Sequence, residues 1–200
     1  TINMNFLLKI LASSPAVSIL IRKIVEVNFR TQKKIIKQYF QNGSNERVLD
    51  FGCGTGEFSP SFSRGQYVGI DMDLKNIAYA KKHYKGDFLV ADGRKLPFPN
   101  ENFDKVLVVG VFHHLSADDC RLVFNEIRRV LKKDGKILIM EDTRSRRLIV
   151  RILQSTDQGA YIRDLSEWNS LIADNFSIEK SGVFNNGACF YSYFLVKLKF

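Results

Sequence analysis

Short apolar runs alternate with helical patterns through the middle of this 200-residue chain. The runs KVLVVG (105–110) and KILIM (136–140) are almost continuously apolar, which is typical of strands buried on both faces. Strands alternating with helices predict βαβ units with right-handed crossovers, and so a parallel sheet covered on both sides. The expected strands are 47–51, 67–70, 88–91, 105–110 and 136–140.

Helical spacing of apolar residues predicts the helices between these strands. One is expected over Leu74–His83, with Asp73 as its N-cap. Another is expected over 118–131, with Leu122, Val123, Ile127 and Val130 on one side.

The N-terminal part predicts a helical extension of about 42 residues. Apolar positions recur at helical spacing over 16–29 and again over 31–41, and Pro15 suits the first turn of a helix. Asn42-Gly43-Ser44 then ends the pattern.

The C-terminal part predicts a helix and an antiparallel hairpin added to the sheet. Leu165–Ala173 is helical in pattern, with Trp168 and Leu171 turned inward. Two β-rich runs, 176–183 and 188–197, flank the turn Asn185-Asn186-Gly187.

Length and composition predict one globular domain. Hydrophobic residues make up 45% and charged residues 26%, which is globular composition. We divide the domain 1–200 into a helical lid (1–42), a core (46–142) and a final loop, helix and hairpin (143–200). Cys53, Cys120 and Cys189 form no CxxC pair, so we expect neither a disulfide framework nor a metal site, and a cytoplasmic location.

The net charge of +9 is concentrated in two stretches. Residues 1–46 hold seven Lys or Arg against two Glu, and residues 121–151 hold ten against four acids. These can be solvated faces, or they can attract RNA, an anionic lipid surface or a phosphorylated molecule. The longest uncharged N-terminal stretch, 10–21, is shorter than the roughly 20 residues of a membrane span, so no transmembrane segment is expected. Peripheral membrane contact and the oligomeric state stay open.

A glycine-rich loop, DFGCGTGEF (50–58), directly follows the first expected strand. Gly52, Gly54 and Gly56 allow backbone to approach a ligand closely at the carboxyl edge of the sheet. The GxGxG spacing differs from the GxGxxG of dinucleotide-binding loops, and no Walker motif is present. A tight turn without a ligand is the alternative.

Several segments in order resemble one enzyme family. VLDFGCGTGEFS (48–59) resembles the first motif of class I S-adenosylmethionine-dependent methyltransferases, and YVGIDMD (67–73) resembles their second-strand motif. The resemblance continues through Ala91-Asp92-Gly93, 96–115 and 126–142, and is nearest to the small-molecule type called type 11. It implies a doubly wound, Rossmann-like sheet of seven strands in the order 3-2-1-4-5-7-6, the last antiparallel. It also implies S-adenosyl-L-methionine as cofactor and S-adenosyl-L-homocysteine as product.

The resemblance assigns the adenosine half of the cofactor. Asp71 would hold the ribose hydroxyls. Its separation from Gly52 along the chain is close to the ~20 residues expected for a ribose-binding acid. Met72 would pack on adenine, which Asp92 and Gly93 would recognise. A helix cap at Asp71 and a plain turn at Asp92-Gly93 are the alternatives.

The resemblance also assigns the methionine half. Asp50 and the backbone of Gly52 and Gly54 would face the amino and carboxylate groups, with Gly110 on the same rim. Cys53 would be a small loop side chain near the cofactor and not a nucleophile.

The loop after the fourth strand contains His113 and His114. One of them, preferably His114, would act as general base or orient the acceptor. The alternative is that one caps a turn and the other lies on the surface. Packing or surface roles are expected for five weaker candidates: Arg30, Glu141, Asp142, Tyr161 and Arg163.

Three functions are compatible with these features. The apolar N-terminal helices favour a methyltransferase acting on a small-molecule or lipid-like acceptor. The basic charge favours an RNA methyltransferase, although the [ND]PP[YF] motif of base-amine methylation is replaced by VGVF. A cofactor-binding protein without catalysis is the third.

Overall fold

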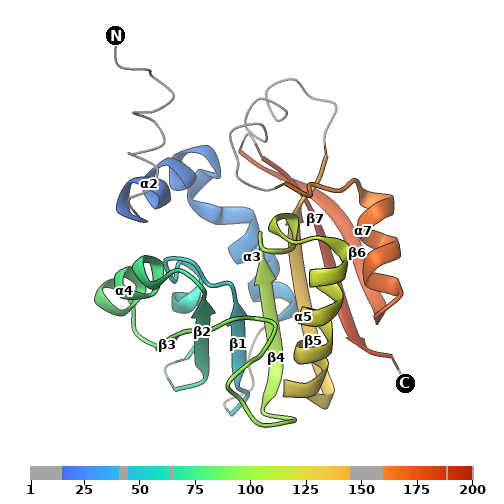
Figure 1. Ribbon diagram of the computed structural model, residues 1–200. Helices are drawn as coiled ribbons and strands as arrows, with labels where there is room; N and C mark the ends of the chain where they lie inside the picture. The colour runs from blue at the N-terminus through green and yellow to red at the C-terminus, as the bar shows by residue number, and fades with distance from the viewer. Residues whose placement is uncertain (1–14, 41–44, 64, 145–159, 188, 200) are drawn as a thin grey trace.

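A seven-stranded sheet forms the centre of the computed structural model, which describes residues 15–40, 45–63, 65–144, 160–187 and 189–199 (Figure 1). The strands are β1 (Val48–Phe51), β2 (Tyr67–Asp71), β3 (Asp87–Val90), β4 (Phe103–Val109), β5 (Leu131–Asp142), β6 (Phe176–Asn186) and β7 (Cys189–Leu198). Their order is β3-β2-β1-β4-β5-β7-β6, and β7 runs antiparallel to both neighbours. The predicted fold class is confirmed.

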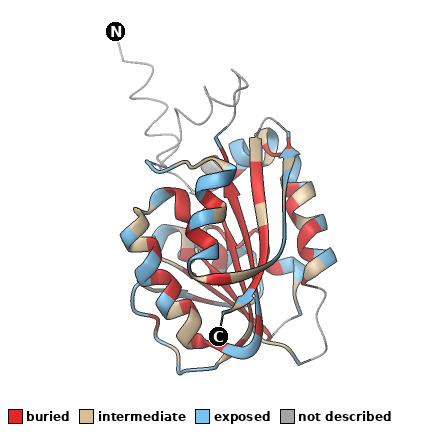
Figure 2. Ribbon diagram, turned by 90° about the vertical axis from the view of Figure 1, so that its right-hand side faces the viewer, coloured by how far each residue is buried: buried red, intermediate tan, exposed pale blue. Residues whose placement is uncertain are grey.

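Helices cover both faces of this sheet. On one face α5 (Ala117–Val130) and α7 (Leu165–Ala173) pack on Val106 and Val108 of β4. On the other face α3 (Arg30–Tyr39) packs on Leu107, because side chains alternate along a strand. Helix α4 (Leu74–His83) covers β2 and β3 on that second face. The buried strands therefore lie between two partly exposed helical layers (Figure 2).

Polar caps define the ends of these helices. Asp73 accepts a hydrogen bond from the Lys75 amide at the start of α4, as predicted. Ser116 caps α5 in the same way, and Asp164 begins α7 with a capping box. Trp168 and Leu171 are buried, which confirms their predicted orientation.

The predicted grouping of four apolar residues on one side of α5 was wrong at Leu122, which is 52% exposed, whereas the other three are buried. The helix instead buries the stripe Cys120, Val123, Phe124, Ile127 and Val130. Leu122 lies one position outside this stripe, at a helical angle that faces solvent.

The predicted continuous helix over 16–29 was also wrong. Helix α2 (Pro15–Val25) stops, and a 3-10 turn at Val27–Phe29 separates it from α3. Val27, Asn28 and Phe29 all have left-handed φ angles, of 46°, 55° and 55°. Such angles cost about 1 kcal/mol each, which the burial of Phe29 helps to offset. Other expectations for 1–14, 41–44 and 145–159 lie outside the described residues.

The N-terminal helices are tied to the last hairpin through a buried polar network. The Glu26 carboxylate accepts hydrogen bonds from Arg22 Nε (2.9 Å), Gln32 Nε2 (2.8 Å) and the Tyr191 hydroxyl (2.8 Å). At the hairpin tip, Asn186 Nδ2 donates to the carbonyl oxygen of Glu26 and to Gln32 Oε1. The first and last parts of the described chain therefore share one polar core.

Candidate active site

Two adjoining cavities lie at the carboxyl end of β1, β2 and β4. Their volumes are about 330 Å³ and 290 Å³. Gly52, Asp71, Val111 and His114 line both, so the cavities meet at these four residues. The larger one, here the adenosine cavity, extends towards Gly93; the smaller one, here the lid cavity, extends beneath α2.

The glycine loop leaves no space for a side chain at its first glycine. Gly52 has a φ of +71°, and a Cβ atom there would lie 2.4 Å from Val111 Cγ2. Gly54 has a φ of +52° with open space in front of it. The loop therefore presents bare backbone to both cavities.

Asp71 ties the end of β2 to this loop. Its Oδ2 accepts from the Gly54 amide (2.9 Å) and its Oδ1 from the Asp73 amide (2.8 Å). Asn76 Nδ2 also donates to Oδ1 at the longer distance of 3.5 Å. A carboxylate has about four acceptor positions, so Asp71 keeps capacity for a ligand hydroxyl, and a second could displace the long bond from Asn76. Asp73, and not Asp71, caps α4, so Asp71 remains available to the cavities.

The far end of the adenosine cavity contains Asp92 and Gly93. Hydrogen bonds from the Arg94 side chain, at 2.9–3.2 Å, hold the pKa of Asp92 below its usual range. Gly93 lies against the ring of Phe51, where a Cβ would clash. Met72 lines the rim with its side chain largely exposed.

Asp50 lies at the bottom of the lid cavity. It is buried and accepts a 2.6 Å hydrogen bond from the Tyr67 hydroxyl. Burial raises the pKa of Asp50 to about 7, and the charge of Asp71 adds to this effect, although the bond from Tyr67 opposes it. Burial likewise raises the pKa of the Cys53 thiol, which keeps it protonated.

A buried carboxylate organises the loop after β4. Glu141 accepts from the amides of Val111 and Phe112 (both 2.9 Å) and of His113 (3.3 Å), and lies 3.0 Å from His113 Nδ1. His113 is buried by these contacts, whereas His114 is exposed and lines both cavities. Of the two predicted histidines, only His114 faces the cavities.

Arg163 holds the same loop from the other side. Its guanidinium donates to the carbonyl oxygens of Phe112 (3.1 Å) and Leu115 (2.9 Å) and lies 4.7 Å from the centre of the Trp168 ring. The Tyr161 amide donates to the carbonyl oxygen of His113 (2.9 Å). These two residues support the histidine loop, as packing roles require.

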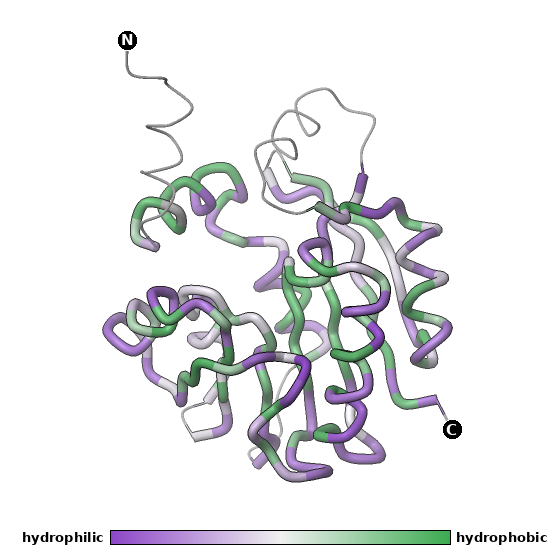
Figure 3. Tube along the Cα trace, in the orientation of Figure 1, coloured by the Kyte–Doolittle hydropathy of each residue, from purple (hydrophilic) through white to green (hydrophobic). Residues whose placement is uncertain are grey.

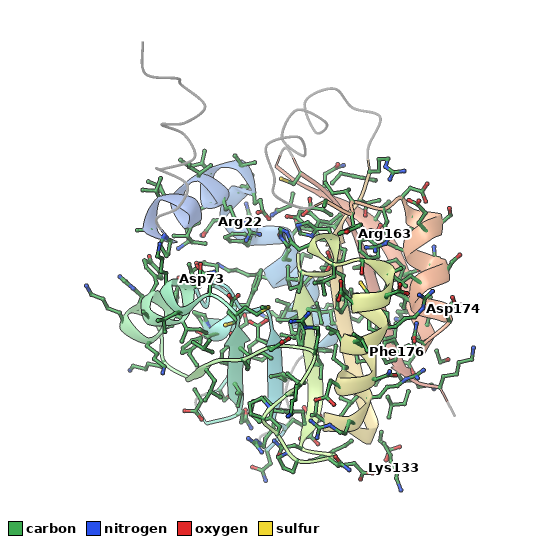
Figure 4. All side chains as sticks on the ribbon, in the orientation of Figure 1. Arg22, Asp73, Lys133, Arg163, Asp174 and Phe176 are labelled. Carbon is green, nitrogen blue, oxygen red and sulfur yellow. The ribbon has the colours of Figure 1, made fainter. Side chains whose placement is uncertain are left out.

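The lid cavity has a roof that the sequence did not identify. Ile19 and Arg22 of α2 and Phe29 line it, whereas Arg30 is exposed and is not among its lining residues. Figure 4 shows Arg22 and Arg163 at the same end of the molecule, opposite Lys133. The available signal was the spacing of Ile19, Arg22 and Glu26 on one side of α2.

A second carboxylate fastens this roof to the glycine loop. Glu57 accepts from Lys23 Nζ (2.9 Å), Lys33 Nζ (2.8 Å) and the Tyr84 hydroxyl (2.7 Å). Although burial opposes it, these three donors hold the pKa of Glu57 below its usual range. Both N-terminal helices are therefore anchored on one buried acid.

Comparison with known proteins agrees with this geometry. Residues 49–139 match the family model described as a methyltransferase domain. A demethylmenaquinone methyltransferase of Thermotoga maritima is 33% identical over 128 residues, which are 61% of this chain and 55% of that protein. The chain thus spans about half the length of that relative.

Two further matches extend the comparison. The probable tRNA methyltransferase 9B of Mus musculus is 31% identical over 107 residues, 52% of this chain and 24% of that protein. A crystal structure of a SAM-dependent methyltransferase from Methanosarcina mazei has a TM-score of 0.67 at 20% identity and covers 82% of this chain and 97% of its own. That similarity supports the fold.

The cavities fit the cofactor of this family. Bare backbone at Gly52, the Asp71 carboxylate with spare acceptor capacity, and the floor at Gly93 match a nucleoside carrying a ribose diol. Together with the matched family model and the sheet order, these features confirm the resemblance found in the sequence. Over residues 49–139 the chain matches a methyltransferase domain, and its fold and cavities are similar to those of the class I S-adenosylmethionine-dependent methyltransferases.

Proposed function

We propose that this chain transfers the methyl group of S-adenosylmethionine to a small, apolar or lipid-like acceptor. The observation that carries the proposal is the similarity to a demethylmenaquinone methyltransferase. The lid cavity has a mixed lining, in which Ile19, Phe29, Phe58 and Val109 form an apolar part beside the charged side chains of Arg22, Asp50 and Glu57. His114 stands where it meets the adenosine cavity. An apolar acceptor entering beneath α2 would reach that junction.

Four polar groups would hold the cofactor. Asp71 would accept from both ribose hydroxyls, and Gly93 would let adenine approach the backbone. At the methionine end, Asp50 would pair with the ammonium group and Arg22 with the carboxylate. Arg22 is held towards the cavity by its 2.9 Å bond to Glu26.

The protein would contribute orientation and exclusion of water. When bound, S-adenosylmethionine supplies a sulfonium methyl group that is open to in-line displacement. Phe29 and Phe58, whose ring centres lie 5.6 Å apart in an edge-to-face arrangement, would keep water from the acceptor. His114 would orient the acceptor or accept its proton. The His113–Glu141 pair would act only by holding the loop that carries His114.

The relatives support two acceptor classes. The demethylmenaquinone methyltransferase similarity, over the longer aligned segment, favours a quinol-like acceptor. The similarity to a probable tRNA methyltransferase, together with the net charge of +9, keeps RNA as the second candidate. A cofactor-binding protein without turnover is the remaining alternative.

Calorimetry with S-adenosylmethionine tests the first half of the proposal. Two charge-assisted hydrogen bonds are lost in Asp71→Ala, so its affinity should fall about 100-fold. Asp118→Ala is the control, because Asp118 is an exposed acid on α5. Equal affinity of Asp71→Ala and wild type would overturn the cofactor assignment.

The second half is tested by transfer from labelled S-adenosylmethionine. A demethylmenaquinone analogue and bulk tRNA should be offered separately. We expect label in the quinol and formation of S-adenosylhomocysteine. Label in tRNA alone would replace the proposed acceptor, and binding without turnover on either would favour the non-catalytic alternative.

A further inference from the structure

An exposed apolar stripe runs along the outer side of α2. Leu20, Ile21, Ile24 and Val27 are 59%, 47%, 72% and 51% exposed. Leu20, Ile21 and Ile24 lie at helical spacing on one side of α2, and Val27 lies in the turn that follows the helix. The hydropathy colouring shows α2 largely in green (Figure 3).

The opposite side of α2 is committed to the protein. Ile19 and Arg22 line the lid cavity, Lys23 pairs with Glu57, and Glu26 is buried in the polar network. These contacts fix the rotation of the helix. The contacts that place Ile19 and Arg22 over the lid cavity therefore also direct the apolar stripe outward.

The chain segment that carries this stripe is strongly basic. Residues 15–40 contain six Lys or Arg, and their one acid is Glu26, which is buried. Arg30, Lys34 and Lys37 are exposed. An exposed apolar helix side, followed in the chain by the exposed cations of α3, is suited to the interface of an anionic bilayer, where apolar side chains enter the acyl boundary and cations meet headgroups.

We infer that α2 docks this protein on the surface of an anionic lipid bilayer through Leu20, Ile21, Ile24 and Val27. Among the described residues, no helix has the length and apolar character to cross a bilayer. The contact is therefore peripheral. Docking would place α2, which lines the lid cavity, on the bilayer in which a lipid-like acceptor dissolves. The inference thus rests on the proposed function and extends it.

Vesicle flotation of the full chain tests the inference. Wild type should float with vesicles of phosphatidylcholine and phosphatidylglycerol in equal amounts. It should bind less to phosphatidylcholine alone, and binding should weaken as salt is added. The variant Leu20→Ser/Ile24→Ser should bind anionic vesicles about tenfold less tightly, because two apolar side chains are removed from the contact.

Leu122→Ser is the matched control, since Leu122 is a similarly exposed leucine on α5. It should float like wild type. The inference would be overturned if wild type did not bind anionic vesicles, or if the double variant bound them as tightly as wild type. It would also be overturned if wild type bound no vesicles but formed a dimer in solution that the double variant, and not Leu122→Ser, disrupts. The double variant should still bind S-adenosylmethionine, so failure to float and failure of the proposed function are separate results.

Discussion

The Glu141 carboxylate lies 3.0 Å from Nδ1 of His113 and also accepts the His113 amide. One fully buried acid thus fixes both the backbone and the ring of the residue that precedes His114. The position of His114 at the junction of the two cavities depends on this relationship.

Glu141→Ala should lower the free energy of unfolding by about 3 kcal/mol, because three amide donors and an imidazole lose their buried acceptor. Glu141→Gln keeps one acceptor oxygen and should lose less. Urea denaturation measures both. Methyl transfer by Glu141→Gln should fall more than S-adenosylmethionine affinity, and an equal fall in both would contradict a role confined to the His114 loop.

Gly52→Ala should disrupt the glycine loop. The new methyl group would meet Val111 Cγ2 at 2.4 Å at a left-handed φ, which should cost about 3 kcal/mol of stability. Gly54→Ala is the matched control, because it carries similar backbone strain without a clash. Gly52→Ala/Val111→Ala should recover part of the loss. If the two single alanine variants were equally stable, the clash would not be the cause.

Binding of S-adenosylmethionine should depend on pH through Asp50. Its pKa of about 7 lies above the ordinary 3.8, and the cofactor's ammonium group prefers the ionised form. Affinity should therefore rise about tenfold per unit as pH approaches 7 and level off above it. Asp50→Asn should flatten the profile, as calorimetry across this range would show.

The same group affects stability in the opposite direction. A folded-state pKa raised above the unfolded value stabilises the protein at low pH, and this contribution is lost between about 4 and 7. Asp50→Asn should remove that loss. Unfolding midpoints at both ends of the range measure it, and a wild type and variant with parallel profiles would refute the assignment.

Glu57→Gln should loosen the roof of the lid cavity. Lys23 and Lys33 would lose their shared anion, which should lower stability by about 2 kcal/mol and speed cofactor release several-fold. Because the pKa of Glu57 is lowered, its contribution persists above the ordinary 4.5 and is lost only at lower pH. Stopped-flow release measures the rate. Glu46→Gln, which breaks the ion pair with Lys105 instead, should leave it unchanged.

Local patterns were sufficient to predict the sheet and most of its helices. Buried parallel strands are continuous apolar runs, and Asp73 fixes the start of α4, so Leu74–His83 was predicted to the residue. The glycine loop and Asp71 could be found because their spacing along the chain carries the chemistry. Each of these features depends on residues close in sequence.

The rest depends on contacts between distant residues. No glycine or proline marks the break at Val27–Phe29; the structure holds it through Asn186, far along the chain. The sequence likewise places Glu141 at the end of a strand but does not reveal that it faces His113. The sequence did not reveal that Arg22 lines the lid cavity, because the rotation of α2 depends on the contact of Lys23 with Glu57 and of Glu26 with Tyr191.

The network joining Glu26, Gln32 and Asn186 has a consequence for synthesis of the chain. The helices that line the lid cavity precede the glycine loop in the chain, yet the side-chain amide that bonds Glu26 and Gln32 belongs to the β6–β7 hairpin, far behind it in sequence. A growing polypeptide would expose Glu26 until that hairpin has left the ribosome. The polar contacts of these helices therefore form only after the β6–β7 hairpin has been synthesised, and a chain terminated before that hairpin would contain the complete glycine loop without them.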